Sequence, residues 1–265
     1  MKILKSGKKA EKKEADRLKA SVASIVTSWE KDAHTAMNEI IPQLVCKFSA
    51  RLKGDDMCPP FLQAFLEKRQ RELMVVGPEL DALPSPSEDS DDSDETDEEK
   101  EKKEKNKPKL SKEAMAILAT PPKEVVDLHT EIRSVTRDIA QPCHRIKRWG
   151  QAVIPEASDG GNWAVAVQGS IIDDLHRVEE ISHSASGGQA VYHSVRAALV
   201  QELGKNGNRD LLISLRELDY KEMIGCQIFF RDMHANLLTL YHMIAKNSDK
   251  LKPQTKATRH EAFMY

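Results

Sequence analysis

The sequence has 265 residues, of which 31% are charged and 5% are aromatic, and its formal net charge is −2. This length allows one or two domains, and the shortage of aromatic residues favours long amphipathic helices over a β-sheet. A nearly neutral chain has no overall field to attract nucleic acid or a membrane, and no apolar run is long enough to cross a bilayer. We therefore expect no nucleic-acid partner, no membrane partner, and a cytoplasmic or nuclear location or both.

Four cysteines are scattered along the chain without CxxC spacing: Cys46, Cys58, Cys143 and Cys226. This pattern predicts buried free thiols in a reducing compartment, and neither a disulfide framework nor a zinc site. Two acid–histidine pairs, Asp173 with His176 and Glu180 with His183, have the spacing of a di-iron site. Both pairs lie on one predicted helix, whereas a di-iron bundle needs such pairs on two facing helices. The sequence thus predicts no metal, no cofactor and no catalytic residue.

The first predicted domain, residues 1–83, holds a basic arm, one long helix and a connecting segment. Residues 1–15 are rich in lysine and are expected to fray. Apolar residues then recur every three or four positions, which predicts a helix from about 14 to 52. Its apolar face consists of Leu18, Val22, Ile25, Trp29, Ala33, Met37, Ile40, Leu44, Phe48 and Leu52. Pro42 is expected to bend this helix because it removes a backbone donor, and a short helix is expected within 61–74.

The second predicted domain is an acidic and lysine-rich insert at residues 84–119. Residues 85–99 carry nine acidic side chains and no basic one, and residues 100–109 are mostly lysine. Such a composition predicts disorder, because it buries too little apolar surface to offset the entropy of ordering. Ser87, Ser90, Ser93 and Thr96 follow one another at three-residue steps, and Glu99 lies three residues after Thr96. This spacing suggests acid-directed phosphorylation that starts at Thr96 and continues to the three serines. The alternative is that the segment is a plain solvated tether.

The third predicted domain, residues 120–265, contains three long helices. Thr120 followed by two prolines predicts the start of the first, with the threonine hydroxyl as its cap. Its apolar face runs through Leu128, Ile132, Val135, Ile139, Pro142, Ile146, Trp149 and Val153. The next helix is expected to bury Ile171, Leu175, Val178, Ile181, Ala185, Gly188, Tyr192, Val195 and Leu199. The last is expected to bury Met223, Cys226, Phe230, Met233, Leu237, Tyr241 and Ile244.

Four long helices joined in this order predict an all-α fold, namely an elongated up-down antiparallel four-helix bundle. The last helix has a second apolar face through Ile224, Ile228 and Leu238. That extra width exceeds what one bundle core needs, so it favours packing between subunits in a ring.

A polar stretch separates the first two of these three helices and is predicted to be a working loop. It comprises Pro155, Glu156, Ala157, Ser158, Asp159, Gly160, Gly161, Asn162, Trp163 and Ala164. Glycine allows positive φ and Asp and Asn form turns, so a plain helical hairpin turn is the alternative. Up-down topology brings this loop and the chain terminus to the same end of the bundle. The terminal Phe263, Met264 and Tyr265 offer an aromatic ring and a carboxylate suited to a pocket on a partner.

Several motifs resemble those of the REG-type (eleven-S) proteasome activators. Ile154-Pro155, then Asp159-Gly160 and Asn162-Trp163, and then Val165 to Gln168 are similar to that family's Ile-Pro…Asp-Gly-Asn-Asn-Phe-Gly-Val-x-Val-Gln motif. Glu217-Leu218-Asp219-Tyr220 resembles its motif near the start of the last helix. Leu240 to Asn247, followed by Lys250 to Pro253, resembles its ending. The resemblance covers about residues 120–265.

This resemblance implies a seven-membered ring of four-helix bundles around a pore. It implies that the tails dock between α subunits of the proteasome core particle while the 155–164 loop presses on the gate, so that peptides enter. No nucleotide or covalent chemistry is implied, so the chain is not expected to be an enzyme. Gly161 replaces an asparagine and Ala164 a glycine of the motif, and the extra glycine is expected to make the loop more mobile before docking.

A second function remains open from composition alone. Residues 85–99 could make the protein an acidic-tract helical adaptor or chaperone that binds basic partners.

Overall fold

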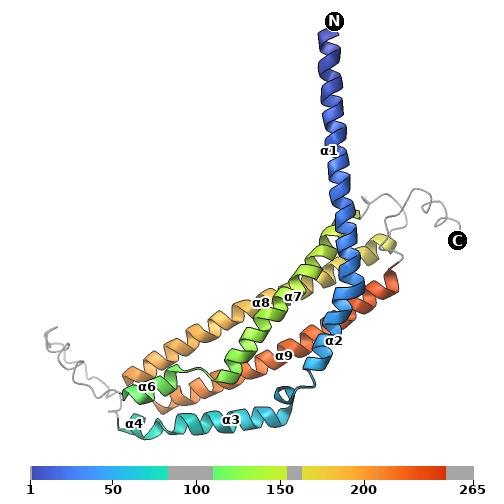
Figure 1. The fold of residues 1–265 in the computed structure, drawn as a ribbon. Coiled ribbons are helices and arrows are strands. Elements are labelled where there is room, and N and C mark those ends of the chain that lie inside the picture. The colour runs from blue at the N-terminus through green and yellow to red at the C-terminus, as the bar shows by residue number, and fades with distance from the viewer. Residues whose placement is uncertain (1, 83–109, 154–162, 207, 249–265) are drawn as a thin grey trace. The chain divides into compact units, whose positions relative to one another are not determined.

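The structure is a computed structural model that describes residues 2–82, 110–153, 163–206 and 208–248. Every secondary-structure element in these ranges is helical (Figure 1). The α-helices are α1 (Lys2–Thr35), α2 (Ile41–Arg51), α3 (Pro59–Met74), α4 (Gly77–Asp81), α6 (Lys112–Ala119), α7 (Lys123–Val153), α8 (Trp163–Asn206) and α9 (Arg209–Asn247). This confirms the all-α prediction. Within the described ranges, no helix is both long and apolar enough for a bilayer.

The helices contribute to two compact units. Unit 1 combines residues 1–51, 135–183 and 231–265, and unit 2 combines residues 52–134 and 184–230. In unit 1, α1, α2 and parts of the three long helices bury the apolar residues Ala33, Met37, Ile41, Phe48, Ile139, Ile146, Trp149, Ile171, Leu175, Met233, Leu237 and Ile244. In unit 2, the core consists of Leu73, Val76, Leu80, Leu110, Ala114, Leu118, Val200, Leu203 and Leu215. The three- and four-residue spacing therefore correctly identified most of the buried faces of α7 and α9.

The first long helix differs from the prediction at its beginning. Helix α1 starts at Lys2, where fraying to residue 15 was expected, because lysine, glutamate and alanine are good helix formers. A π-helical turn at Ala36–Ile40, closed by the Ile41 N–H donating to the Ala36 carbonyl, ends two residues before Pro42, which has no backbone donor. Only the second half of the predicted apolar face is buried. Leu18, Val22 and Ile25 are 63%, 58% and 46% exposed.

The boundary of the predicted insert also needs correction. The described chain resumes at Leu110, and α6 begins at Lys112, seven residues before the predicted end of the insert. Ser111 caps α6 by accepting the Ala114 N–H, and Leu110, Ala114 and Leu118 enter the unit 2 core. Apolar burial of this segment explains why it is ordered. The Thr120 hydroxyl donates to the Ala116 carbonyl, so it closes α6 instead of capping the next helix as predicted.

Helix α8 follows a different face from the one predicted after Val178. The predicted residues Gly188 and Val195 are exposed, whereas three polar residues, each one position after a predicted residue, are buried. These three are Ser182, Gln189 and Arg196, and Tyr192 is buried as predicted. The predicted apolar face therefore lies one residue away from the buried face, because this part of α8 buries hydrogen-bonded polar groups.

Gly187 and Gly188 have nothing within 4 Å of where a Cβ atom would stand. A close helix contact therefore does not explain these glycines. We expect Gly187→Ala and Gly188→Ala each to stabilise the chain by about 1 kcal/mol, because alanine favours a helix by that amount. Chemical denaturation measures this gain. Gly204→Ala on the same helix is a matched control with a smaller expected gain, since its Cβ would lie 3.3 Å from Met115. A loss of stability in Gly187→Ala would contradict the finding that nothing lies within 4 Å of the added Cβ atom.

Candidate functional site

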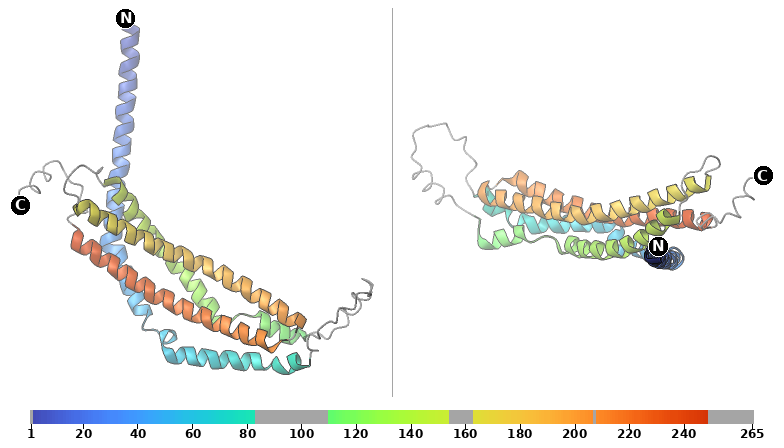
Figure 2. Two further views of the ribbon diagram at one scale, coloured as in Figure 1. Left: turned by 180° about the vertical axis from the view of Figure 1, so that it is seen from behind. Right: turned by 90° about the horizontal axis from the view of Figure 1, so that it is seen from above.

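The helix ends that border the predicted loop and tail all belong to unit 1. Helix α7 ends at Val153, α8 begins at Trp163 and α9 ends at Asn247, as the sequence predicted to within a few residues. The views of unit 1 agree that these three ends lie together (Figures 1 and 2). Two segments of chain, one between α7 and α8 and one after α9, therefore leave the same end of this unit.

Most of the predicted site residues lie outside the described part of the chain. This holds for Pro155 to Asn162 of the loop, for Phe263, Met264 and Tyr265, and for the phosphorylation candidates Ser87, Ser90, Ser93 and Thr96. Trp163 and Ala164 form the first turn of α8, so the last two predicted loop residues are helical.

The last turns of α7, directly before the loop, are anchored to α1. Trp149 is 1% exposed and its ring lies 5.4 Å from the His34 ring, centroid to centroid. Arg148 stacks over the Trp29 ring at 4.5 Å and pairs with Asp32 at 3.6 Å. A cation over an indole face adds electrostatic attraction to the burial of the ring. These contacts hold the loop-bearing end of α7 against the first helix.

The same end of α7 is also fixed to α8. A Cβ atom on Gly150 would lie 3.5 Å from the Ile172 side chain, so the two helices pack closely near the end of α7. Lys147 of α7 forms an ion pair with the mostly buried Glu179 of α8. Burial, followed by the charge of Glu179, raises the pKa of Cys143 to about 12, so this thiol stays protonated and packs as an apolar group.

Unit 2 contains a buried polar network centred on Asp219 of α9, a residue of the motif noted in the sequence. Asp219 is fully buried and accepts hydrogen bonds from Arg69 Nε at 2.8 Å and from Arg196 Nε at 3.1 Å. The Tyr192 hydroxyl donates to the same carboxylate at 2.7 Å. Helices α3, α8 and α9 thus meet at one carboxylate.

The two arginines of this network have further partners. Arg196 donates to the carbonyls of Ala119 and Thr120, which fixes the link between α6 and α7. Arg69 also pairs with Glu72 at 2.9 Å. Burial first, and then the charge of Asp219, raises the pKa of Tyr192, so the phenol remains a donor. The network balances its buried charges and serves to position helices.

Sequence reasoning missed Arg69, Gln189 and Arg196. Spacing could have indicated the two residues of α8, since Gln189 and Arg196 continue the three- and four-residue steps through Val178 and Tyr192. For Arg69 of α3, the sequence carries no comparable signal.

Comparisons with known proteins agree with the motifs. Residues 118–260, more than half of the chain, match the family model of the C-terminal region of proteasome activator PA28. Human proteasome activator complex subunit 3 is 29% identical over 131 residues, which are 49% of this chain and 52% of that protein. Proteasome activator 28 of Dictyostelium discoideum is 29% identical over 129 residues, 48% of this chain and 57% of that protein. The matched part of the chain spans about half the length of these relatives.

Solved structures show that the fold is shared over most of the chain. The 11S subunit of the Plasmodium falciparum proteasome, PA28, superposes with a TM-score of 0.61 at 22% identity over 89% of this chain and 94% of that one. PA26 in complex with an archaeal 20S proteasome gives a TM-score of 0.55 at 13% identity, over 88% and 96%. The helical fold is therefore common to these proteins. From the matched family model and the motifs of the last three helices, the chain belongs to the proteasome activator PA28 family.

Proposed function

We propose that this protein is a proteasome activator that works without ATP. The single observation that supports it is that the helix ends bearing the loop and the tail lie together in unit 1 of a PA28-family chain. In this proposal the protein regulates the proteasome and catalyses no reaction itself, and it needs no cofactor. Its place of action is the cytoplasm, the nucleus or both.

The tails make the attachment in this mechanism. Residues 263–265 insert an apolar, aromatic tip into pockets of the α-ring of the proteasome core particle. One tail binds weakly, but several tails on one ring bind jointly with much higher avidity. The exposed apolar side chains of Leu18, Val22, Ile25 and Ile228 provide area for packing between copies in a seven-membered ring.

The loop 155–164 opens the gate in this mechanism. A loop transmits force only if its ends are held, and the packing of Trp149 on α1 and of Gly150 on α8 fixes the preceding helix. Attached tails then keep the loop pressed against the gate region, so peptides pass more easily into the core particle. Phosphorylation at Ser87, Ser90, Ser93 or Thr96 would act on the insert and outside this contact.

The experiment mixes the protein with core particles and follows hydrolysis of a fluorogenic peptide. We expect the full chain and a variant lacking residues 85–109 to stimulate hydrolysis equally, because neither the loop nor the tail is altered. Negative-stain images should show rings capping the core particles for both proteins. If the deletion removes binding to basic proteins, and the full chain never stimulates hydrolysis, the acidic adaptor is the correct function and the activator is wrong.

A further inference from the structure

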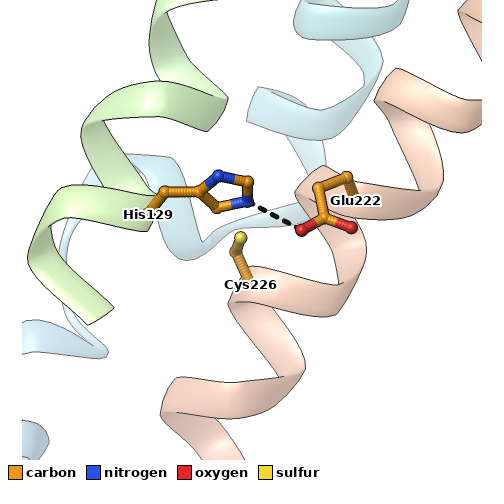
Figure 3. A group of neighbouring side chains, drawn as sticks. All are labelled: His129, Glu222 and Cys226. Atoms are coloured by element: carbon orange, nitrogen blue, oxygen red, sulfur yellow. Dashed lines mark hydrogen bonds and ion pairs between the residues drawn. The ribbon is translucent and has the colours of Figure 1, made fainter. Parts of the chain in front are cut away.

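Three side chains that the proposed function does not use face one another in unit 2. They are His129 on α7 and Glu222 and Cys226 on α9 (Figure 3). One ligand atom from each lies within 4.8 Å of the other two. Glu222 and Cys226 are four residues apart and so share one face of α9. Two long helices, and no loop, therefore hold this cluster.

The cluster is mostly buried and opens to solvent at one side. His129 and Cys226 are 1% and 3% exposed, whereas the Glu222 side chain is 25% exposed. His129 Nε2 lies 2.7 Å from Glu222 Oε1, and the Cys226 thiol forms no disulfide. Glu222 thus provides the route by which an ion could reach the two buried groups.

A cysteine, a histidine and a carboxylate can also form a nucleophilic triad, but this geometry does not. In a triad the thiol and the carboxylate contact different ring nitrogens of the histidine. Here Glu222 contacts Nε2, and Nδ1 lies on the side of the ring away from the Cys226 sulfur (Figure 3). Burial, with the charge of Glu222, raises the pKa of Cys226 to about 12, so the thiol is not activated.

We propose that His129, Glu222 and Cys226 form a binding site for a divalent cation of the zinc class, with an open fourth position beside Glu222. Sulfur, imidazole nitrogen and carboxylate oxygen are the ligands that Zn²⁺ and Co²⁺ accept, whereas Mg²⁺ and Ca²⁺ select oxygen alone. The ion replaces the hydrogen between Nε2 and Glu222 and takes the sulfur as a thiolate, whose proton passes to solvent.

A second buried residue supports this arrangement. A metal at Nε2 of a neutral imidazole requires the ring proton at Nδ1, and this proton needs an acceptor. Gln189 donates to the His129 backbone carbonyl at 3.2 Å. In the described part of the chain, both the Gln189 side-chain oxygen and His129 Nδ1 are buried without a hydrogen-bond partner. Gln189 is therefore suited to orient the histidine once an ion is bound.

The test titrates Co²⁺ into the full chain after metal removal and reduction by a phosphine. We expect one Co²⁺ per chain, with a thiolate-to-cobalt charge-transfer band in the near ultraviolet. Cys226→Ser should abolish this band, and circular dichroism should show that the helices remain. Cys58→Ser and Cys46→Ser are matched controls that should leave the band unchanged, since those thiols lie outside the cluster.

A Zn²⁺ titration by calorimetry tests the other ligands. Glu222→Gln keeps the shape of a partly exposed side chain and should weaken Zn²⁺ binding at least about tenfold, because losing even an outer-shell partner of a ligand costs that much. His176→Gln alters an exposed histidine beside Glu180 and should change nothing. Zn²⁺ should raise the melting temperature of the parent and not that of Cys226→Ser. A charge-transfer band that is absent from the parent, or that survives in Cys226→Ser, would overturn the site.

Discussion

Removing Phe263, Met264 and Tyr265 is expected to reduce stimulation of peptide hydrolysis to the rate of the core particle alone. The tails supply the attachment in the proposed mechanism. Several tails bind jointly, so removing the tip from every copy lowers the affinity for the core particle far more than the loss of one tail would. Hydrolysis of a fluorogenic peptide by purified core particles measures the effect, and co-sedimentation measures binding. Light scattering should show an unchanged assembly, because the helices are intact.

A matched control for this truncation is Thr258→Ala, which changes the tail and keeps its last three residues. We expect this variant to stimulate hydrolysis as the parent does. Full stimulation by the truncated chain would show that the attachment lies elsewhere, and the proposed mechanism would then have to be abandoned.

Replacing Asp219 by alanine is expected to cost about 3–5 kcal/mol of stability. The side chain is fully buried, and its removal takes away the carboxylate oxygens that the Nε groups of Arg69 and Arg196 contact. Both arginines then remain charged without this partner. Asp219→Asn keeps the shape of the side chain and should still be strongly destabilising, because the neutral amide does not balance the two arginines. The denaturant midpoint, measured at equal protein concentration, reports this loss.

Glu217→Gln is the matched control for Asp219. Its side chain is 54% exposed on the same helix and pairs only with Arg216 among the contacts described, so we expect a change within about 0.5 kcal/mol. Tyr192→Phe removes one donor to Asp219 and should cost about 1–2 kcal/mol. If Asp219→Ala were as stable as Glu217→Gln, the network would have no role in holding α3, α8 and α9.

The positions of the long helices could be predicted from the sequence because their apolar faces repeat with the helical period. The break near residue 154, the restart at Trp163 and the end of α9 before Pro253 also carry local signals, namely glycine, turn-forming residues and proline. Trp149 and Ile146 were placed on a buried face for the same reason. In these segments local propensity and tertiary packing favour the same answer.

The candidate sites were predicted unevenly. Asp219 stood out only through its motif, and the partners Arg69 and Arg196 are 150 and 23 residues away from it in sequence. The cluster of His129, Glu222 and Cys226 was missed, because cysteine spacing carries no information about a histidine on another helix. Pairings between helices leave no mark in the spacing of a single sequence.

The all-α class, the approximate bounds of α7, α8 and α9, and the family could be read from the residues alone, because each follows from local period, caps and short motifs. The packing of the helices was needed to show which polar residues of α8 are buried, why residues 110–119 are helical, and which side chains meet at Asp219 and Cys226. A polar group can be buried at low cost only with a hydrogen-bond partner, and in these cases the partner comes from a distant part of the chain.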